Sequence, residues 1–150
     1  MIFTNKAQLF QALPKNGRLL ALDIGTKRIG VAISDEDRFI ATPKLIINRQ
    51  SNLKDFAKIA EFISTNLVCA IIIGLPLNMN ESNSKMAEFV KKFGENLDDF
   101  FEKKLPIIFF DERLTSFEAR NFNSSQLSRK KNKFFDDIAA SLILQHFLQS

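Results

Sequence analysis

The segment from Leu19 to Ala32 constrains the fold of this chain more than any other part of it. Its first half is an apolar run that ends on a single carboxylate, Asp23, and its second half is another apolar run that starts at Ile29. A turn that contains Gly25 separates the two runs, and such a short connection predicts antiparallel neighbours in a sheet. Because a carboxylate at the end of a buried strand costs stability unless it is hydrogen-bonded or binds a cation, Asp23 is a candidate functional residue.

The rest of the chain alternates between apolar runs of strand length and segments with helical periodicity. The expected strands are Leu19–Asp23, Ile29–Ser34, Phe39–Ile47, Val68–Ile73 and Ile107–Phe110. The expected helices are a preface over Met1–Leu13, two that start near Ser51 and Ser82, a short one at Thr115–Glu118 and a final one over Phe134–Gln149. Strands that alternate with helices require parallel crossover connections. The sequence therefore predicts an α/β fold, with a mixed five-stranded sheet (three antiparallel strands plus two parallel) and helices on both faces.

Length and composition favour one soluble domain. The 150 residues are enough for a core but too few for two domains of ordinary size, so residues 1–150 are expected to form a single domain, with residues 1–16 as a helical preface. The sequence has no apolar run of membrane-spanning length and no signal-peptide pattern, so no membrane partner is expected. The one cysteine, Cys69, cannot form an internal disulfide, which favours a cytoplasmic location.

Three acidic residues stand at the ends of predicted elements. Asp23 ends the first strand, Glu112 follows the strand Ile107–Phe110, and Asp136 opens the final helix on its apolar stripe. The carboxyl ends of parallel strands meet at one edge of a sheet, and carboxylates gathered there can bind a divalent metal ion. Taken singly, Asp23 also fits a turn residue, and Asp136 also fits a residue that interacts favourably with a helix dipole.

A cluster of basic residues precedes and enters the final helix. Its members are Arg129, Lys130, Lys131 and Lys133. The chain has a net charge of +4 at pH 7, and this cluster is either a solvated connector or a loop that grips nucleic-acid phosphates. The segment after the strand Val68–Ile73 contains Asn78. That segment is either a tight strand-to-helix turn or a loop that contacts a phosphate or a sugar.

The tetrapeptide Asp23-Ile24-Gly25-Thr26 also has the form of a phosphate loop, as in actin-like or sugar-kinase-like nucleotide sites. Enzymes of those classes enclose ATP between two large domains, whereas this chain has room for one. Nucleotide binding is therefore the least favoured interpretation of this segment.

Four motifs, in order along the chain, resemble the signatures of one bacterial protein family. The motifs are Asp23-x-Gly25-x-x-Arg28-x-Gly30-Val31-Ala32, Gly74-Leu75-Pro76-Leu77-Asn78-Met79, Asp111-Glu112-Arg113-Leu114-Thr115 and Lys131-x-Lys133-x-x-Asp136-x-x-Ala139-Ala140. The family is YqgF, or RuvX, a bacterial relative of the RuvC Holliday-junction resolvases. The resemblance spans about Leu19 to Leu148, and it departs from the family at Asn80-Glu81, where Asp-Gly is common.

The resemblance implies a ribonuclease H-like fold and a nuclease that matures the 5′ end of pre-16S rRNA. It implies Asp23, Glu112 and Asp136 as catalytic residues, which would bind one or two Mg²⁺ or Mn²⁺ ions. The expected nucleic-acid-binding residues are Arg28, Asn78, Arg113, Arg129, Lys130, Lys131 and Lys133. The expected partner is structured RNA, with the ribosome or branched DNA as further candidates. A Holliday-junction resolvase and a non-catalytic rRNA-binding factor are the alternatives, and the sequence leaves the oligomeric state open.

Overall fold

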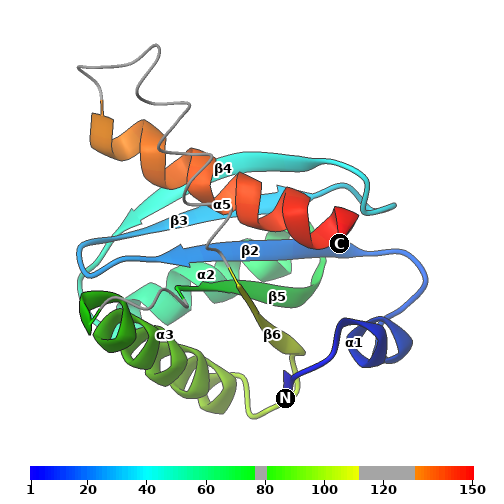
Figure 1. The fold of residues 1–150 in the computed structure, drawn as a ribbon. Helices are drawn as coiled ribbons and strands as arrows, with labels where there is room; N and C mark the ends of the chain where they lie inside the picture. Colours follow the sequence, from blue (N-terminus) through cyan, green and yellow to red (C-terminus); the bar gives the residue numbers. More distant parts are fainter. Residues whose placement is uncertain (77–80, 112–130) are drawn as a thin grey trace.

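The computed structural model describes residues 1–76, 81–111 and 131–150, and the side chains of all of these except 81–83 and 131–137. In these residues, six strands form one sheet with helices against both faces (Figure 1). In chain order the elements are β1 (Ile2–Phe3), α1 (Lys6–Ala12), β2 (Arg18–Ile24), β3 (Arg28–Ser34), β4 (Ala41–Asn48), α2 (Asn52–Asn66), β5 (Val68–Leu75), α3 (Glu81–Phe100), β6 (Ile107–Asp111) and α5 (Lys131–Gln149).

The sheet is mixed, with the strand order β1-β6-β5-β2-β3-β4. Strands β1, β6, β5 and β2 run parallel to one another, and β3 is antiparallel to both of its neighbours, β2 and β4. This arrangement confirms the predicted α/β class and the mixed sheet with helices on both faces. The predicted number of five strands was wrong by one, because β1 adds to the edge of β6.

The sixth strand comes from the segment that was predicted as a helical preface. Ile2 and Phe3 pair with two residues of β6, and the Ile107 N–H donates to the Met1 carbonyl at 2.8 Å. The helix in this segment is limited to α1, which Asn5 caps by accepting a hydrogen bond from the Gln8 N–H at 3.1 Å. A strand of two residues shows no periodicity, so a sequence pattern could not reveal it.

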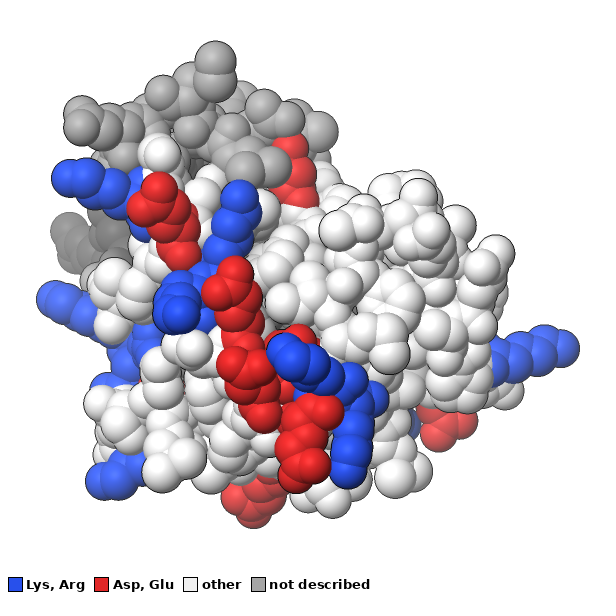
Figure 2. Space-filling model, turned by 90° about the horizontal axis from the view of Figure 1, so that it is seen from below, with Lys and Arg blue, Asp and Glu red and all other residues white. Residues whose placement is uncertain are grey.

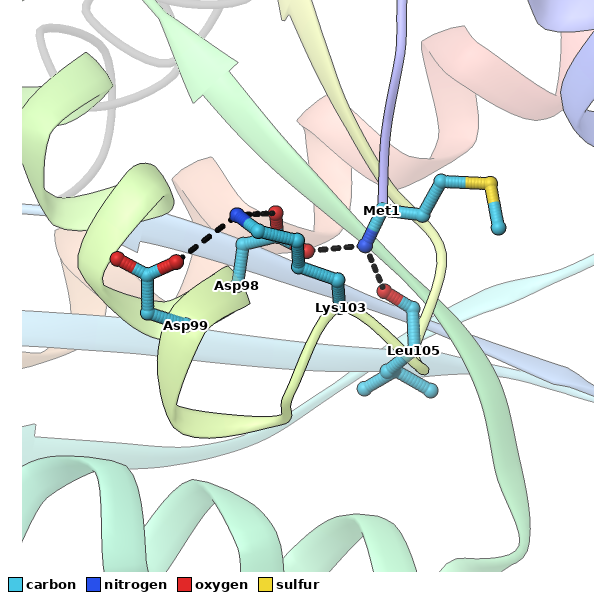
Figure 3. A network of polar contacts seen from close by, with 5 residues as sticks. All are labelled: Met1, Asp98, Asp99, Lys103 and Leu105. Atoms are coloured by element: carbon cyan, nitrogen blue, oxygen red, sulfur yellow. Dashed lines mark hydrogen bonds and ion pairs between the residues drawn. The ribbon is translucent and has the colours of Figure 1, made fainter.

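Polar contacts hold the start of β1 against the end of α3 (Figure 3). The Met1 α-amino group forms an ion pair with Asp98 and donates to the Leu105 carbonyl at 3.2 Å. Lys103 Nζ lies 3.5 Å from the Asp98 carboxylate and 2.9 Å from that of Asp99. Because Asp98 is buried, these two cations offset the cost of removing its charge from water.

The core forms two layers, one on each face of the sheet. Leu20 and Leu22 of β2 pack in the layer with α2 and α3, whereas Leu19 and Ala21 pack in the layer with α5. This alternation is the two-residue period of a strand buried on both sides. It therefore also decides which face each following residue of β2 occupies.

The β3–β4 connection is longer than predicted, so β4 begins at Ala41. Phe39 and Ile40 belong to the turn because the Asp35 carboxylate accepts both of their N–H groups, each at 2.8 Å. Their side chains are 74% and 63% exposed. On the other side of the turn, the Gln145 amide accepts from the Ala41 N–H and donates to the Phe39 carbonyl, both at 3.0 Å. These two bonds fix α5 to the start of β4.

Helix α2 begins where the capping pattern predicts, since the Ser51 hydroxyl accepts the Lys54 N–H at 3.2 Å. The short helix predicted at Thr115–Glu118 lies outside the described residues. Among the helices of the described ranges, none combines the length and the apolarity that a bilayer crossing requires.

Candidate active site

The carboxyl ends of β2, β5 and β6 meet at one edge of the sheet, which we call the carboxyl edge. Leu22 of β2 pairs with Ile73 of β5, and Ile73 pairs with Phe109 of β6. Asp23 follows Leu22, so it lies in the next row of the sheet, close to where these strands end. Open α/β sheets commonly carry their functional crevice at this edge.

Asp23 lies between two glycine positions. It pairs with Gly30 on β3, and the next-row position on β5 is Gly74. The residues two and four positions before Asp23 pack toward α5, so the alternation of β2 places Asp23 on that face, where it is half-buried. Because glycine has no side chain, neither flanking strand fills the space beside the carboxylate.

The β2–β3 turn brings a cation to the same face. The Gly25 N–H donates to the Arg28 carbonyl at 2.8 Å, and a Cβ at Gly25 would lie 2.7 Å from that oxygen, so the turn requires glycine there. Arg28 opens β3 and is half-buried. By the two-residue period of β3, Arg28 lies on the same face as Gly30 and Ala32, and Ala32 packs toward α5. Asp23 and Arg28 therefore share the α5 face of the carboxyl edge.

Helix α5 runs back along β2, so its first turns lie toward the carboxyl edge (Figure 1). Gln145 is bound to the start of β4, beside Ser34, whose hydroxyl accepts the Leu19 N–H at 2.9 Å. From Gln145 back to position 136 the helix covers about 13 Å. Strand β2 covers about the same distance, ~13 Å, from Leu19 to Asp23. The first turns of α5, which include position 136, therefore lie toward the end of the sheet that carries Asp23 (Figure 1).

The buried stripe of α5 changes from large to small side chains toward this edge. Phe147 and Ile143 are buried near its end, and Ala140 and Ala139 are buried nearer its start. Position 136 precedes the two alanines by one turn on the same stripe. Small side chains let a helix backbone approach a sheet more closely, so α5 can pack tightly against the sheet at these two alanines.

Several predicted site residues lie outside the described residues. They are Asn78, Glu112, Arg113, Arg129 and Lys130. For Lys131, Lys133 and Asp136, which lie in α5, only the backbone is described. Within the part of the chain that is described, no three acidic, histidine or cysteine side chains are grouped as a metal site. The three-carboxylate site thus stays a prediction.

Two features of this edge were missed by the sequence analysis. Gly30 and Gly74 each belong to a motif, but their places on either side of Asp23 follow from strand register, which a linear pattern does not contain. The second feature is an ion pair between Arg49 and Asp55, which joins the end of β4 to the first turn of α2. Its only sequence signal was a pair of opposite charges six residues apart.

Comparisons with known proteins agree on one family. A family model described as RuvX, Holliday junction resolvase, matches residues 17–150. A Thermoanaerobacter pseudethanolicus protein named "Putative pre-16S rRNA nuclease" is 44% identical over 136 residues, which cover 89% of this chain and 96% of that protein. A Rickettsia bellii protein of the same name is 39% identical over 152 residues, which cover 100% of this chain and 97% of that protein.

Solved structures support the fold. RuvC of T. thermophilus, in complex with a Holliday junction substrate, matches with a TM-score of 0.54 and 10% identity, over 89% of this chain and 94% of that one. At this identity the likeness shows a common fold, and it confirms the ribonuclease H-like architecture that the motifs implied. Because the family model spans most of the chain and the relatives align over nearly their whole length, this chain belongs to the RuvX family.

Proposed function

We propose that this chain is a divalent-metal-dependent endonuclease that processes the 5′ end of pre-16S rRNA. One observation carries the proposal: Asp23 lies on the α5 face of the carboxyl edge, between two glycine positions. The curated relatives named for pre-16S rRNA support the substrate. In this proposal residues 1–150 act as one cytoplasmic domain.

The proposed ligands are Asp23, Glu112 and Asp136, and their chemistry fits Mg²⁺ or Mn²⁺. All three offer carboxylate oxygens, the hard donors that these ions prefer. With an ion held by these residues, the site would supply an activated water nucleophile and stabilisation of the leaving oxygen of the phosphodiester. Asp23 contributes a half-buried carboxylate on a buried strand, which holds its oxygens in place before any ion binds.

The alternation of β6 supports Glu112 over its neighbour Asp111 as the second ligand. Ile108 and Phe110 pack in the layer with α5, whereas Ile107 and Phe109 pack in the opposite layer. By this period Asp111 faces away from α5, on the opposite face of the sheet from Asp23, so we propose its neighbour in the chain, Glu112, as the ligand instead.

The proposed nucleic-acid contacts are led by a cation on the same face as Asp23. Arg28 shares the face of Asp23, and its guanidinium can bind a phosphate with two donors. The other proposed contacts are Asn78, Arg113, Arg129, Lys130, Lys131 and Lys133. Lys131 and Lys133 open α5, the end of the helix that lies toward the carboxyl edge. An RNA backbone could therefore approach the metal ligands and the basic cluster from the same side.

A Holliday-junction resolvase is the second candidate function, and two observations favour it. The family model carries that description, and the RuvC fold accommodates a four-way junction in its solved complex. In that case the same three carboxylates would hold the metal ions for the cleavage of DNA. A third candidate, an rRNA-binding factor without cleavage, would need the basic residues but not the metal ligands.

One experiment separates these candidates. The purified protein is incubated with Mg²⁺ or Mn²⁺ and either pre-16S rRNA or a synthetic four-way DNA junction, side by side with the Asp23→Asn variant. We expect the wild type to cleave the RNA near its 5′ end and the Asp23→Asn variant not to cleave it. Cleavage of the junction alone would favour the resolvase, and RNA binding without any cleavage would favour the non-catalytic factor.

A further inference from the structure

Arg49 joins four elements beside the carboxyl edge. It follows β4, directly after Asn48, which pairs with Arg28 at the start of β3. Its backbone N–H donates to the Lys27 carbonyl at 2.9 Å, in the turn that connects β2 to β3. Its side chain extends the other way, toward α2 and α3, and only 13% of it is exposed. The residue thus connects the turn next to Asp23 with the helices on the far face of the sheet.

The Arg49 guanidinium is fixed by polar contacts to α2. Its Nε lies 3.2 Å from Oδ2 of Asp55, a carboxylate that is fully buried, and its Nη2 donates to Asn52 Oδ1 at 2.6 Å. Asp55 Oδ1 also accepts the Gln50 N–H at 3.2 Å, so the carboxylate holds both the side chain and the backbone of this connection. Breaking a buried ion pair leaves each charge buried without compensation, which is costly. The Arg49 and Asp55 side chains are therefore strongly held in this paired geometry.

Two aromatic rings of α3 complete the environment of the guanidinium. Its central carbon lies 5.5 Å from the Phe89 ring centroid and 5.1 Å from that of Phe93. Cation–π contacts at such distances stabilise a cation most when it is shielded from water, as it is here. Lysine at this position could keep the charge, but it could not keep the planar fork that contacts Asp55 and Asn52 together.

From these contacts we propose that Arg49 is a positioning residue for the metal site. Its side chain locks residues 49–51 to α2 and α3, and its N–H holds the β2–β3 turn in the conformation that sets Asp23 and Arg28 on one face. Without the side chain, this connection loses its anchor and the turn samples more conformations. A metal ion must then order the turn when it binds, which weakens binding. The inference rests on the proposed role of Asp23 as a metal ligand.

Arg38 serves as a control residue, because it lies near the start of β2, at the end of the strands opposite the carboxyl edge. The Arg38 guanidinium donates to the carbonyls of Gly17 and Pro14, each at 2.8 Å, and lies 5.4 Å from the Phe10 ring centroid. Arg38→Met therefore removes a similar number of hydrogen bonds and a ring contact near the start of β2, far from the carboxyl edge, but without leaving a buried carboxylate unpaired. Both variants should lose stability, but only Arg49→Met should change the metal site.

The test is the affinity of the full chain for Mn²⁺, measured by calorimetric titration at a temperature where circular dichroism shows each variant folded. We expect Arg49→Met to bind Mn²⁺ about tenfold more weakly than the wild type, the low end of what loss of a supporting residue costs. Arg38→Met should bind it like the wild type. Arg49→Lys, which keeps the charge opposite Asp55, should fold and bind about threefold more weakly, since it loses the fork.

The outcomes separate this inference from the proposed function. If Asp23→Asn abolishes Mn²⁺ binding while Arg49→Met and Arg49→Lys bind like the wild type, Arg49 has no positioning role. If Arg38→Met weakens binding as much as Arg49→Met, the effect is one of general stability and the inference fails. If Asp23→Asn binds Mn²⁺ unchanged, the proposed metal site itself is wrong. Should Arg49→Met not fold, Arg49→Lys alone decides.

Discussion

Asp23 is the residue on which the proposed chemistry depends most, and its replacement by asparagine removes the charge at nearly constant shape. A ligand that binds only the folded protein stabilises it by about 2.7 kcal/mol at one hundred times its dissociation constant. Asp23→Asn should lose most of this stabilisation by Mn²⁺, together with cleavage. Thermal unfolding with chelator and with excess Mn²⁺ measures the effect.

The control for this measurement is Glu36→Gln. Glu36 is an exposed acid just beyond the end of β3, at the end of the strands opposite the carboxyl edge. It should keep the full response to Mn²⁺. An Asp23→Asn protein that is stabilised by Mn²⁺ as much as the wild type would show that Asp23 is not a ligand.

Asp35 carries a pH dependence that is unrelated to catalysis. The N–H of Ile40, and also that of Phe39, holds the pKa of the Asp35 carboxyl below its usual value of 3.8. A carboxyl whose pKa is depressed in the folded state stabilises the fold above its unfolded pKa, and this contribution is lost as the pH falls through the folded value. Wild type should therefore exceed Asp35→Asn in stability at neutral pH, and the difference should shrink below pH 3.8.

Urea unfolding of both proteins at several pH values checks this expectation. Because Asp35 is only half-buried, the effect should be modest and should weaken further in high salt. A difference that stayed constant from neutral to acidic pH would mean that the asparagine acts through shape rather than through charge.

Sequence reasoning singled out Asp23 because it ends an apolar run, where a charged residue is conspicuous, and Arg28 because it belongs to a motif that resembles the family signature. It did not find Arg49, whose contacts come from the β2–β3 turn, α2 and α3, and of these the turn and α3 are distant in the chain. The two glycines beside Asp23 were visible as residues but not as neighbours. Side chains whose role depends on register or on packing between elements cannot be read from linear spacing.

Helix α3 packs tightly against the sheet at Gly94. A Cβ there would lie 2.4 Å from Phe109 Cζ and 2.8 Å from Cε1, so the ring of β6 would have to move. Overpacking costs about 1–3 kcal/mol, more than the roughly 1 kcal/mol by which alanine exceeds glycine in helix propensity. Gly94→Ala should therefore be less stable than the wild type in urea unfolding.

Ser84→Ala, on the exposed face of the same helix, is the control for propensity. It should change the free energy of unfolding by a few tenths of a kcal/mol at most. If Gly94→Ala were more stable than the wild type, the ring of Phe109 would have room to move at little cost.

The long elements were predictable because each repeats its pattern several times. The strand at Val68 and the helices after Ser51 and Ser82 all appear within a few residues of their expected bounds. The errors fall on short segments governed by single polar contacts. The Asp35 carboxylate keeps Phe39 and Ile40 out of β4, and two residues near the start of the chain form β1. Local propensity does not decide such segments.

Viewed as a whole, the molecule does not carry its positive charge evenly. Figure 2 shows the side of the molecule that faces downward in Figure 1, where acidic side chains form a band with lysines and arginines beside it. The exposed residues of α3 include both signs, with Glu88, Glu95 and Asp99 among Lys91 and Lys92. A polyanion gains little from such a mixed surface. We therefore expect it to bind instead at the basic cluster, whose members are Arg129, Lys130, Lys131 and Lys133.

Replacing Arg129, Lys130, Lys131 and Lys133 together by alanine should weaken the binding of RNA and of DNA alike. Each phosphate contact adds about 0.7 to 0.9 to the slope of log affinity against log salt concentration, so the slope should become shallower. Binding measured by fluorescence anisotropy at several salt concentrations gives this slope. A variant with the wild-type slope would identify the cluster as a solvated connector.

The pairing of β1 with β6 has a consequence for how the molecule assembles. Its two partners are separated by about one hundred residues, and contacts between such distant parts of a chain form late because closing the loop between them is entropically costly. During synthesis, Ile2 and Phe3 cannot form this pairing until Ile107 and Ile108 have emerged from the ribosome. The outer edge of β6 can therefore be covered only after β6 itself has been made, by a segment that was synthesised long before it.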